Sequence, residues 1–216
     1  MRSQWTNIKV YSLAYKQFKN PRYLQAAELI AQYLFDFWAS PEGGFHASQD
    51  ADLIQGVKGH EYFALKRAER LKRGLPRIDK NLYAGENGLA IDALLMLYDA
   101  SGKEIYLNKA LVALRWVLKN RRYADGGFRH NHTDDAGPYL SDTLYMGRAF
   151  LRLYEQNGDK QALELAVKAG NFIHRYFRHP DAGCLSAADN GTPVKPIPQL
   201  DQNIAAARFM LTLTKH

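Results

Sequence analysis

A pattern that occurs three times along the chain constrains its fold more than any other feature. In each copy a leucine is followed 19 residues later by the start of a small glycine-containing loop, and the three spans are Leu24 to Gly43, Leu107 to Gly126 and Leu163 to Ala182. Each leucine is also followed by alanine three residues on and by an aromatic residue nine residues on, namely Tyr33, Trp116 and Phe172. Offsets of three and nine lie on different stripes of a helix, so the pattern predicts repeated helices that are packed on more than one side.

A second helix is expected before each of these leucines. The sequence places these helices at about 7–18, 87–100 and 141–157, and a further helix runs from 201 to the end. The turn within each pair is short and contains Pro21, Gly102 or Gly158, residue types that begin or end helices. The repeating unit is therefore a helical hairpin followed by a long loop, and the three loops span about 40–61, 122–139 and 179–199.

Smaller elements are expected in the first loop. Residues 45–48 and 60–63 predict a short β-hairpin around Gly56 and Gly59, and residues 64–73 predict a short basic helix that ends at Gly74. Units of about 50–60 residues are longer than ordinary solenoid repeats. We therefore predict an all-α fold in one domain over 1–216, a partial (α/α)6 toroid of seven or eight helices with a short β-hairpin in the loops. Because a closed toroid of six hairpins is larger, the chain is expected to form an open horseshoe or to be covered by a partner chain or a second copy.

Composition excludes several classes of protein. The chain has 216 residues, of which 46% are hydrophobic and 24% are charged, so it is neither disordered nor collagen-like. Its apolar runs fall short of the ~20 residues that a membrane-spanning helix needs, and the first residues lack the apolar stretch of a signal peptide. The single cysteine, Cys184, excludes an internal disulfide and is expected to be a small buried side chain. We expect a cytoplasmic protein that does not contact membranes.

The charge of the chain is unevenly distributed. The net charge is +7, and between residues 56 and 80 there are eight lysines and arginines against three acids. This segment is expected to be either a solvated helix face or a rim that binds anions.

Several segments together resemble one protein family. Residues 43–52 read GGFHASQDAD and residues 59–63 read GHEYF, followed by RIDK at 77–80, ENGLA at 86–90 and DQNIA at 201–205. This series resembles the YyaL-like family of thioredoxin-domain-containing proteins, related to spermatogenesis-associated protein, over most of the chain. The resemblance implies an α/α toroid similar to six-hairpin glycosidases and N-acylglucosamine 2-epimerases. The family's thioredoxin-like domain, which precedes its toroid, has no counterpart in this sequence, so no redox role is expected.

Two carboxylates in the most specific of these segments are the first candidates for chemistry. Asp50 and Asp52 lie two residues apart, so in an extended segment they share a face. Such a pair can bind a cation, hold sugar hydroxyls or share a proton. Alternatively, it caps its own backbone in a turn.

The starts of the inner helices bring in further polar residues. Asp142 and Asp201 suit N-cap positions, but in a toroid these helix starts can also surround one mouth of the cavity, where acids and aromatic walls would bind a sugar. The candidate catalytic carboxylates are Asp50, Asp52, Glu61, Glu86, Asp142 and Asp201. The candidate substrate-binding residues are Gln49, His60, Tyr62, Tyr83, Asn87, Phe128, Arg129, His130 and Tyr139.

The sequence leaves the type of reaction open. Glycoside hydrolysis requires two carboxyl groups at a defined separation. Epimerisation requires a base within reach of a sugar carbon, most often a histidine, for which His46, His60 and His130 are the candidates. Arg129 suits the carboxylate of a uronate.

Two further expectations concern a metal site and an acid within a helix. The loop with His130, His132, Asp134 and Asp135 has metal-ligand residue types, but polar loops of this kind are common, so we expect no metal and no cofactor. Asp92 lies among apolar residues of the helix from 87 and is expected to face outward, because a buried acid would need a partner.

Three functions follow from these observations. The first is a carbohydrate-related toroid that binds or processes a sugar or uronate in a loop-lined cavity. The second is a non-catalytic interaction module that docks with a partner chain or with itself. The third is weak nucleic-acid binding through the basic residues 58–80; we rank it last because the chain has no nucleic-acid-binding motif.

Overall fold

The computed structural model describes residues 2–134, 137–181 and 183–216. Long helices form three hairpins and one single helix, which are α1 (Arg2–Phe18) with α2 (Pro21–Phe37), α5 (Ala84–Ser101) with α6 (Glu104–Asn120), α7 (Leu140–Asn157) with α8 (Lys160–Phe177), and α9 (Leu200–Leu213). The helical hairpins predicted from the repeat are confirmed. With the short helices α3 and α4, the described residues contain nine helices.

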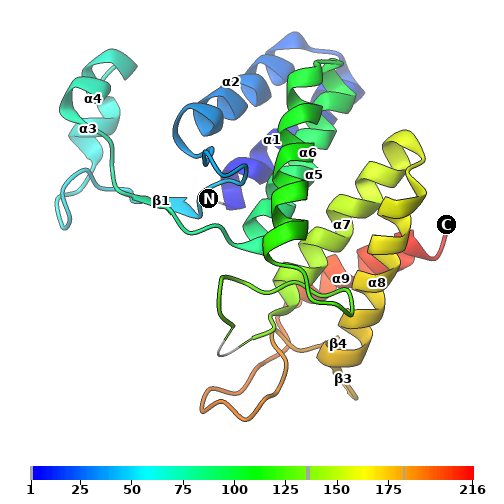
Figure 1. The fold of residues 1–216 in the computed structure, drawn as a ribbon. Coiled ribbons are helices and arrows are strands. Elements are labelled where there is room, and N and C mark those ends of the chain that lie inside the picture. Colours follow the sequence, from blue (N-terminus) through cyan, green and yellow to red (C-terminus); the bar gives the residue numbers. More distant parts are fainter. Residues whose placement is uncertain (1, 135–136, 182) are drawn as a thin grey trace.

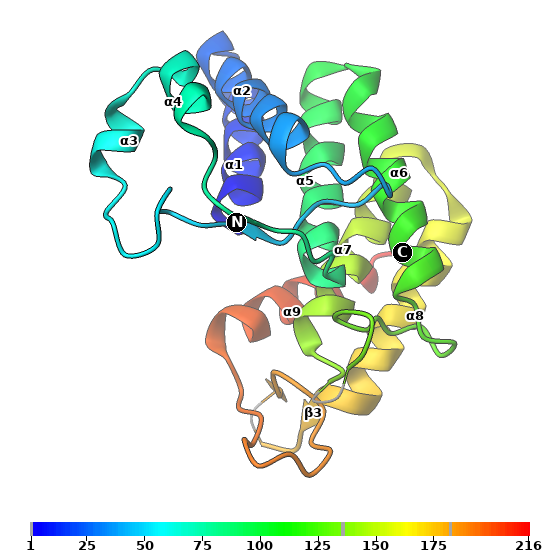
Figure 2. The same ribbon diagram turned by 60° about the vertical axis from the view of Figure 1, so that its left-hand side comes forward.

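The long helices form two layers (Figure 1). Helices α1, α5, α7 and α9 form the inner layer, in which α5 packs against both α1 and α7, and α7 packs against α9. Helices α2, α6 and α8 each pack on the outside of their hairpin partner, and the turned view shows the pairs side by side (Figure 2). This arrangement is a partial α/α toroid, as expected.

Local signals in the sequence define the hairpin turns. The side chain of Asn20 accepts a hydrogen bond from the backbone N–H of Arg22, with Pro21 as the first residue of α2. Helices α5 and α7 both end at a glycine in the left-handed conformation, Gly102 with φ 69° and Gly158 with φ 73°. Glycine has no Cβ, so this conformation costs little there. The three turns lie together at the top of Figure 1, and most of the long loops lie at the opposite end.

Close contact between α5 and α7 forms the centre of the core. Both helices are buried over most of their length. A Cβ atom on Gly88 of α5 would lie 2.7 Å from the backbone carbonyl carbon of Tyr145 on α7, which is far inside van der Waals contact. Glycine at this position therefore lets the two backbones meet, and the contact brings the first turns of both helices together.

The loop after each outer helix is fastened in the same way. A backbone hydrogen bond closes each loop, from His46 N to Trp38 O, from Arg129 N to Arg121 O, and from Leu185 N to Phe177 O, at 2.7–2.8 Å. The fourth residue of the next inner helix then accepts a hydrogen bond from the loop backbone, Asn87 from Phe45, Thr143 from Phe128, and Asn203 from Cys184. The threefold pattern in the sequence thus reflects one repeated structural device.

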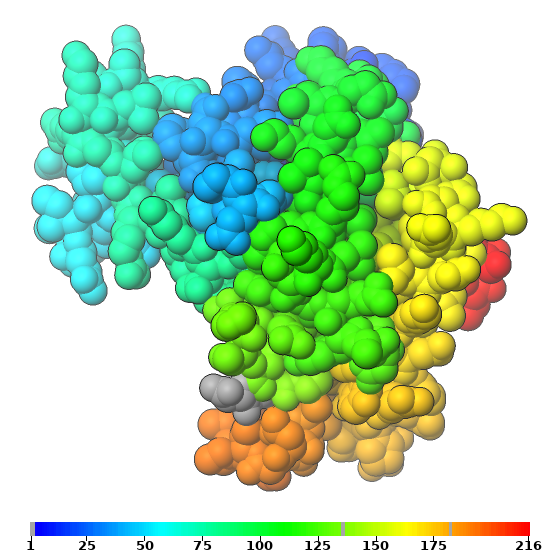
Figure 3. All heavy atoms as spheres, viewed as in Figure 1, coloured from blue at the N-terminus to red at the C-terminus, as the bar shows by residue number. Residues whose placement is uncertain are grey.

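Residues 48–79 form an arm that extends from the body of the protein (Figure 3). At its base, strand β1 (Ser48–Gln49) pairs antiparallel with β2 (Ile78–Asp79), and between them lie α3 (His60–Ala64) and α4 (Arg67–Arg73). The expected hairpin between 45–48 and 60–63 is therefore wrong, because residues 60–63 are helical and the partner strand comes 30 residues after β1. The basic helix is shorter than expected because the backbone is extended at Leu65 and Lys66.

A second small hairpin joins β3 (Arg178–His179) to β4 (Gly183–Cys184) after α8. Within the described parts of the chain, no helix combines the length and the apolar character needed to cross a bilayer.

Candidate functional site at the starts of α5 and α7

Three titratable side chains meet where α5 and α7 begin. Glu86 lies in the first turn of α5, Asp142 lies in the first turn of α7, and His130 comes from the loop that follows α6. One oxygen or nitrogen atom of each side chain lies within 4.8 Å of the corresponding atoms of the other two. All three are among the residues proposed from the sequence, and the structure brings them together.

Asp142 connects this cluster to the fold. Its side chain has no exposed surface, and its Oδ1 accepts a hydrogen bond of 2.6 Å from the backbone N–H of Gly85. The expected role of Asp142 as N-cap of its own helix is wrong, since Tyr139 holds that position and makes no side-chain cap. Asp142 instead satisfies an unpaired N–H at the start of the neighbouring helix α5, where a negative charge is also stabilised by the helix dipole.

His130 is fixed through both its ring and its backbone. Its ring Nδ1 lies 3.0 Å and 3.1 Å from the two carboxylate oxygens of Asp142. Its backbone oxygen accepts a hydrogen bond from Ala84 N, and its backbone N–H donates to Asp134. Asp134 also accepts a hydrogen bond of 2.7 Å from the hydroxyl of Tyr123, so it holds the loop in place.

Burial and charge shift the titration of this pair. Burial raises the pKa of Asp142, although its hydrogen bond with His130 partly opposes that shift. Burial by itself would lower the pKa of His130, but the hydrogen bond to Asp142 and the nearby charges of that carboxylate and of Glu86 outweigh it and raise the pKa above its ordinary value. Each shift favours the protonated form of the side chain concerned.

Two tyrosines flank the imidazole ring. The ring of Tyr83 stacks on His130 with centroids 4.0 Å apart and planes 12° apart, and Tyr139 approaches edge-on at 5.4 Å. The side chain of His130 keeps 33% of its surface exposed. Because Nδ1 faces Asp142, the other ring nitrogen, Nε2, is the one available to a bound molecule, and the tyrosines supply apolar walls beside it.

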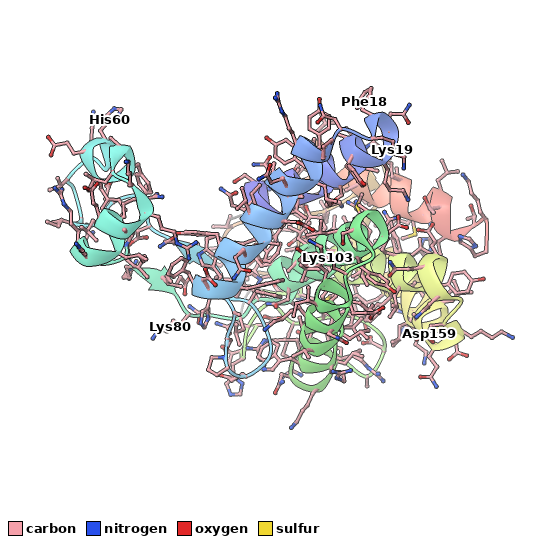
Figure 4. The ribbon with its side chains drawn as sticks, turned by 90° about the horizontal axis from the view of Figure 1, so that it is seen from above. Phe18, Lys19, His60, Lys80, Lys103 and Asp159 are labelled. Carbon is pink, nitrogen blue, oxygen red and sulfur yellow. The ribbon has the colours of Figure 1, made fainter. Side chains whose placement is uncertain are left out.

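The residues of the arm do not join this cluster. Asp50 is exposed and pairs with Arg77 at 3.1 Å. Asp52 accepts a hydrogen bond from the backbone N–H of Gly59 and so acts in a turn, which was the alternative open from the sequence. Four other candidates of the arm also lie away from the cluster. Gln49 accepts a hydrogen bond from the Tyr33 hydroxyl, and the buried Tyr62 donates one to the backbone oxygen of Gly74. His60 and Glu61 are exposed on α3. Figure 4 shows His60 far from the helical body.

Other candidates lie in the body of the protein but outside this cluster. Asn87 is fully buried and bonds to the backbone of Phe45 through both its amide oxygen and its amide nitrogen. Phe128 is 1% exposed within the hydrophobic core, so it cannot stack on a ligand. Arg129 lies over the ring of Tyr123 at 5.1 Å, and Asp201 is exposed in the first turn of α9, whose N-cap is Gln199.

Further expectations about polar residues need correction. Asp92 does not face outward; it is 3% exposed, and its carboxylate pairs with Lys9 and Arg152. Cys184 is half-buried rather than fully buried, and burial raises the pKa of its thiol. Of the loop residues with metal-ligand character, His132 is exposed and Asp135 lies outside the described residues. The set of Glu86, His130 and Asp142 offers one ligand atom each and is the group in the described chain that could hold a metal ion.

Comparisons with known proteins identify the fold. No protein-family model and no curated protein matches the chain, so the resemblance to the YyaL-like family stays a prediction. Solved structures do match. They include a sugar epimerase from a ruminal bacterium at 18% identity with a TM-score of 0.76, covering 98% of this chain and 53% of that one. Cellobiose 2-epimerase from Spirochaeta thermophila matches at 15% identity with a TM-score of 0.76, covering 98% of this chain and 52% of that one.

A hydrolase shares the same architecture. An unsaturated glucuronyl hydrolase specific for heparin matches at 14% identity with a TM-score of 0.70, covering 98% of this chain and 57% of that one. The chain therefore shares the α/α toroid fold of these two epimerases and this hydrolase, and it spans about half the length of these structures.

Proposed function

We propose that the chain binds a sugar between Tyr83 and Tyr139 and that His130 transfers a proton to or from a sugar carbon. The observation that carries this proposal is the hydrogen bond from Nδ1 of His130 to the buried carboxylate of Asp142. A carboxylate in this position fixes the tautomer of the ring and stabilises the imidazolium that forms when Nε2 takes up a proton. The sugar epimerases with the same fold support the substrate class.

The geometry favours proton transfer over hydrolysis. Glycoside hydrolysis needs two carboxyl groups that both reach the substrate. Asp142 has no exposed surface and lies behind His130, so it does not meet a bound sugar directly. Epimerisation needs a base that removes a proton from the carbon next to a carbonyl, and an acid that returns a proton to the opposite face. We assign the first role to His130 and the second to Glu86, which is partly exposed and lies close to His130.

Exchange of hydrogen with solvent tests this proposal. The protein is incubated in D2O with reducing sugars, including glucose, mannose, N-acetylglucosamine, glucuronate and cellobiose, and deuterium at the carbon next to the carbonyl is followed by NMR. We expect exchange with at least one sugar, and we expect His130→Gln to abolish it. His132→Gln is the matched control, because His132 is exposed in the same loop two residues away. Equal exchange in His130→Gln and the unmodified protein would overturn the assignment.

A second candidate function is docking with another chain. The arm exposes apolar side chains, with Ile54 64%, Val57 57% and Phe63 50% exposed. Exposed apolar patches often mark interaction sites, and the chain spans only about half of the toroids that it matches. Sedimentation velocity at tens of micromolar tests this candidate. A second copy as the partner predicts a dimer that Ile54→Ser with Phe63→Ser disrupts, whereas a monomer at every concentration would exclude self-association.

A further inference from the structure

A second cluster of charged residues lies on the inner layer and takes no part in the proposed chemistry. Its members stand at the same level of four helices: Lys9 is the eighth residue of α1, and Asp92, Arg148 and Arg208 are the ninth residues of α5, α7 and α9. At a rise of about 1.5 Å per residue, all four lie about 11–12 Å along their helix from its first residue. Arg152 lies one turn further along α7. We call these five residues the charged belt: Lys9, Asp92, Arg148, Arg152 and Arg208.

The belt is built around one buried carboxylate. The side chain of Asp92 is 4% exposed and pairs with Lys9 and with Nε of Arg152 at 3.1 Å. Arg148 lies 3.7 Å from the same carboxylate, which is an ion-pair distance but too long for a good hydrogen bond. Each of these partners comes from α1 or α7, so the group belongs to the inner layer and not to the contacts between hairpin partners.

Positive charge exceeds negative charge in the pocket beside Asp92. A polar pocket of about 190 Å³ beside Asp92 is lined by Arg148, Arg152, Arg208 and Glu155, together with three other residues. With Lys9 behind it, four cations face two carboxylates. Glu155 is already engaged by Arg152 at 3.3 Å and by His216 at 3.8 Å. Like charges this close repel each other strongly in a partly buried site.

Burial and the neighbouring charges both change the pKa values of the buried groups in this cluster. Burial, together with the charges of Arg148 and Arg152, holds the pKa of Lys9 below its ordinary value even though Asp92 opposes the shift. The surrounding cations lower the pKa of Asp92 against the effect of its burial, so this carboxylate stays charged.

We propose that this pocket binds an oxyanion, a phosphate or carboxylate group, on the guanidinium groups of Arg148 and Arg208. Within the described chain, the guanidinium of Arg208 makes no hydrogen bond or ion pair, and the guanidinium of Arg148 makes only the long contact with Asp92. Guanidinium groups present paired donors that match the oxygens of phosphate and carboxylate. Two uncompensated positive charges suit a dianion such as a phosphate monoester. The volume equals that of about six water molecules at about 30 Å³ each, which admits such a group.

Binding of inorganic phosphate at constant ionic strength tests this inference, and it is measured by titration calorimetry. We expect saturable binding that Arg208→Gln weakens at least about tenfold and that Arg148→Gln with Arg208→Gln abolishes. Arg208 is exposed, so its replacement alone leaves the core intact. Arg115→Gln is the matched control, because Arg115 is exposed on the outer helix α6, and it should bind as the unmodified protein does.

Comparison of glucose 6-phosphate, glucose and inorganic phosphate identifies the source of the oxyanion. Tighter binding of glucose 6-phosphate, lost in the same variants, indicates a phosphorylated sugar, whereas equal binding indicates a free anion. No saturable binding of phosphate, glucose 6-phosphate or gluconate would overturn the inference, as would equal binding by the double variant. If the pocket instead takes an acidic segment of a second copy, the protein should self-associate and bind no anion. That result would also overturn the inference. His130→Gln should leave anion binding unchanged, so this test is independent of the proposed proton transfer.

Discussion

Nδ1 of His130 lies 3.0 Å from a carboxylate oxygen of Asp142, a side chain that has no exposed surface. This pair connects the loop after α6 with the first turn of α7, and through Gly85 it also reaches α5. It thus has a structural as well as a chemical consequence, because the same carboxylate stabilises a helix start and orients the imidazole. Measurements of titration, stability and activity can separate the structural role of this pair from its chemical role.

Asp142→Asn should lower the pKa of His130. The hydrogen bond and the charge of Asp142 are what raise this pKa, and without them burial, which acts in the opposite direction, should predominate. The pKa is measured from the Cε1–H chemical shift of His130 in NMR spectra recorded between pH 5 and pH 9. The Cε1–H resonance of His132, which is exposed in the same loop, serves as the internal control. An unchanged pKa for His130 would show that the pair does not form in solution.

Stability should depend on pH through His130 with a defined sign. Its pKa in the folded state is raised above the ordinary 6.5, so its contribution to the free energy of unfolding is fully present below that pH and is lost as the pH rises through the raised value. Urea denaturation at pH 5.5, 7 and 8.5 measures this effect as the difference between the unmodified protein and His130→Gln. We expect the difference to shrink as the pH rises; a difference that grows would contradict the assignment.

Asp92→Asn should destabilise the protein by about 3–5 kcal/mol. Removing one partner of a buried ion pair leaves the others without compensation, and this cost is usually of that size. Asp99→Asn is the matched control, because Asp99 lies seven residues later on α5 and pairs with Lys16, seven residues after Lys9. That second pair is about half exposed on both sides, so its loss should cost less than about 1 kcal/mol. Equal effects of the two substitutions in urea denaturation would refute the difference in burial.

Asn87→Ala should cost about 1–3 kcal/mol of stability. The side chain is fully buried, and its removal leaves the backbone N–H and C=O of Phe45 without their partner. Asn81→Ala is the control, because Asn81 is exposed and bonds only within the neighbouring loops, so its effect should stay within about 0.5 kcal/mol. Thermal denaturation measures both variants, and a neutral Asn87→Ala would show that the loop fastening is dispensable.

Gly88→Ala should also destabilise the protein, by about 1–3 kcal/mol, because its Cβ would lie 2.7 Å from backbone atoms of Tyr145 that cannot move freely. Gly170→Ala on α8 is a suitable comparison. There the nearest atom is 3.1 Å away at the end of the Leu213 side chain, so alanine should be tolerated and gains helix propensity. If both variants unfold at the same urea concentration, the close contact between α5 and α7 does not limit stability.

The sequence predicted the helices and part of the site for clear physical reasons. Helical hairpins leave local signals, such as Pro21 and Gly102 at the turns, and repeated packing leaves a repeated pattern. Glu86 and Asp142 could be found because they occupy the first turns of the inner helices, and these turns meet when α5 and α7 pack together.

Two of the errors come from contacts between residues distant in sequence. Asp92 was expected to face outward because a buried acid needs a partner, and that partner, Lys9, lies 83 residues earlier. Strand β1 finds its partner 30 residues later, beyond the helices of the arm. The segment with Asp50 and Asp52 gave the most specific motif, yet Asp52 serves a turn and Asp50 pairs with Arg77 at the surface.

Binding of a sugar against His130 is tested by an NMR titration of the histidine Cε1–H resonances with glucose, mannose, N-acetylglucosamine, glucuronate and cellobiose. We expect at least one of these sugars to move the His130 resonance in a saturable way while His132 and His60 stay unchanged. We also expect Tyr83→Ala to weaken the effect, because it removes the ring stacked on His130. If none of the sugars shifts His130, or if a sugar shifts the exposed histidines equally, the site at the starts of α5 and α7 is not a sugar site.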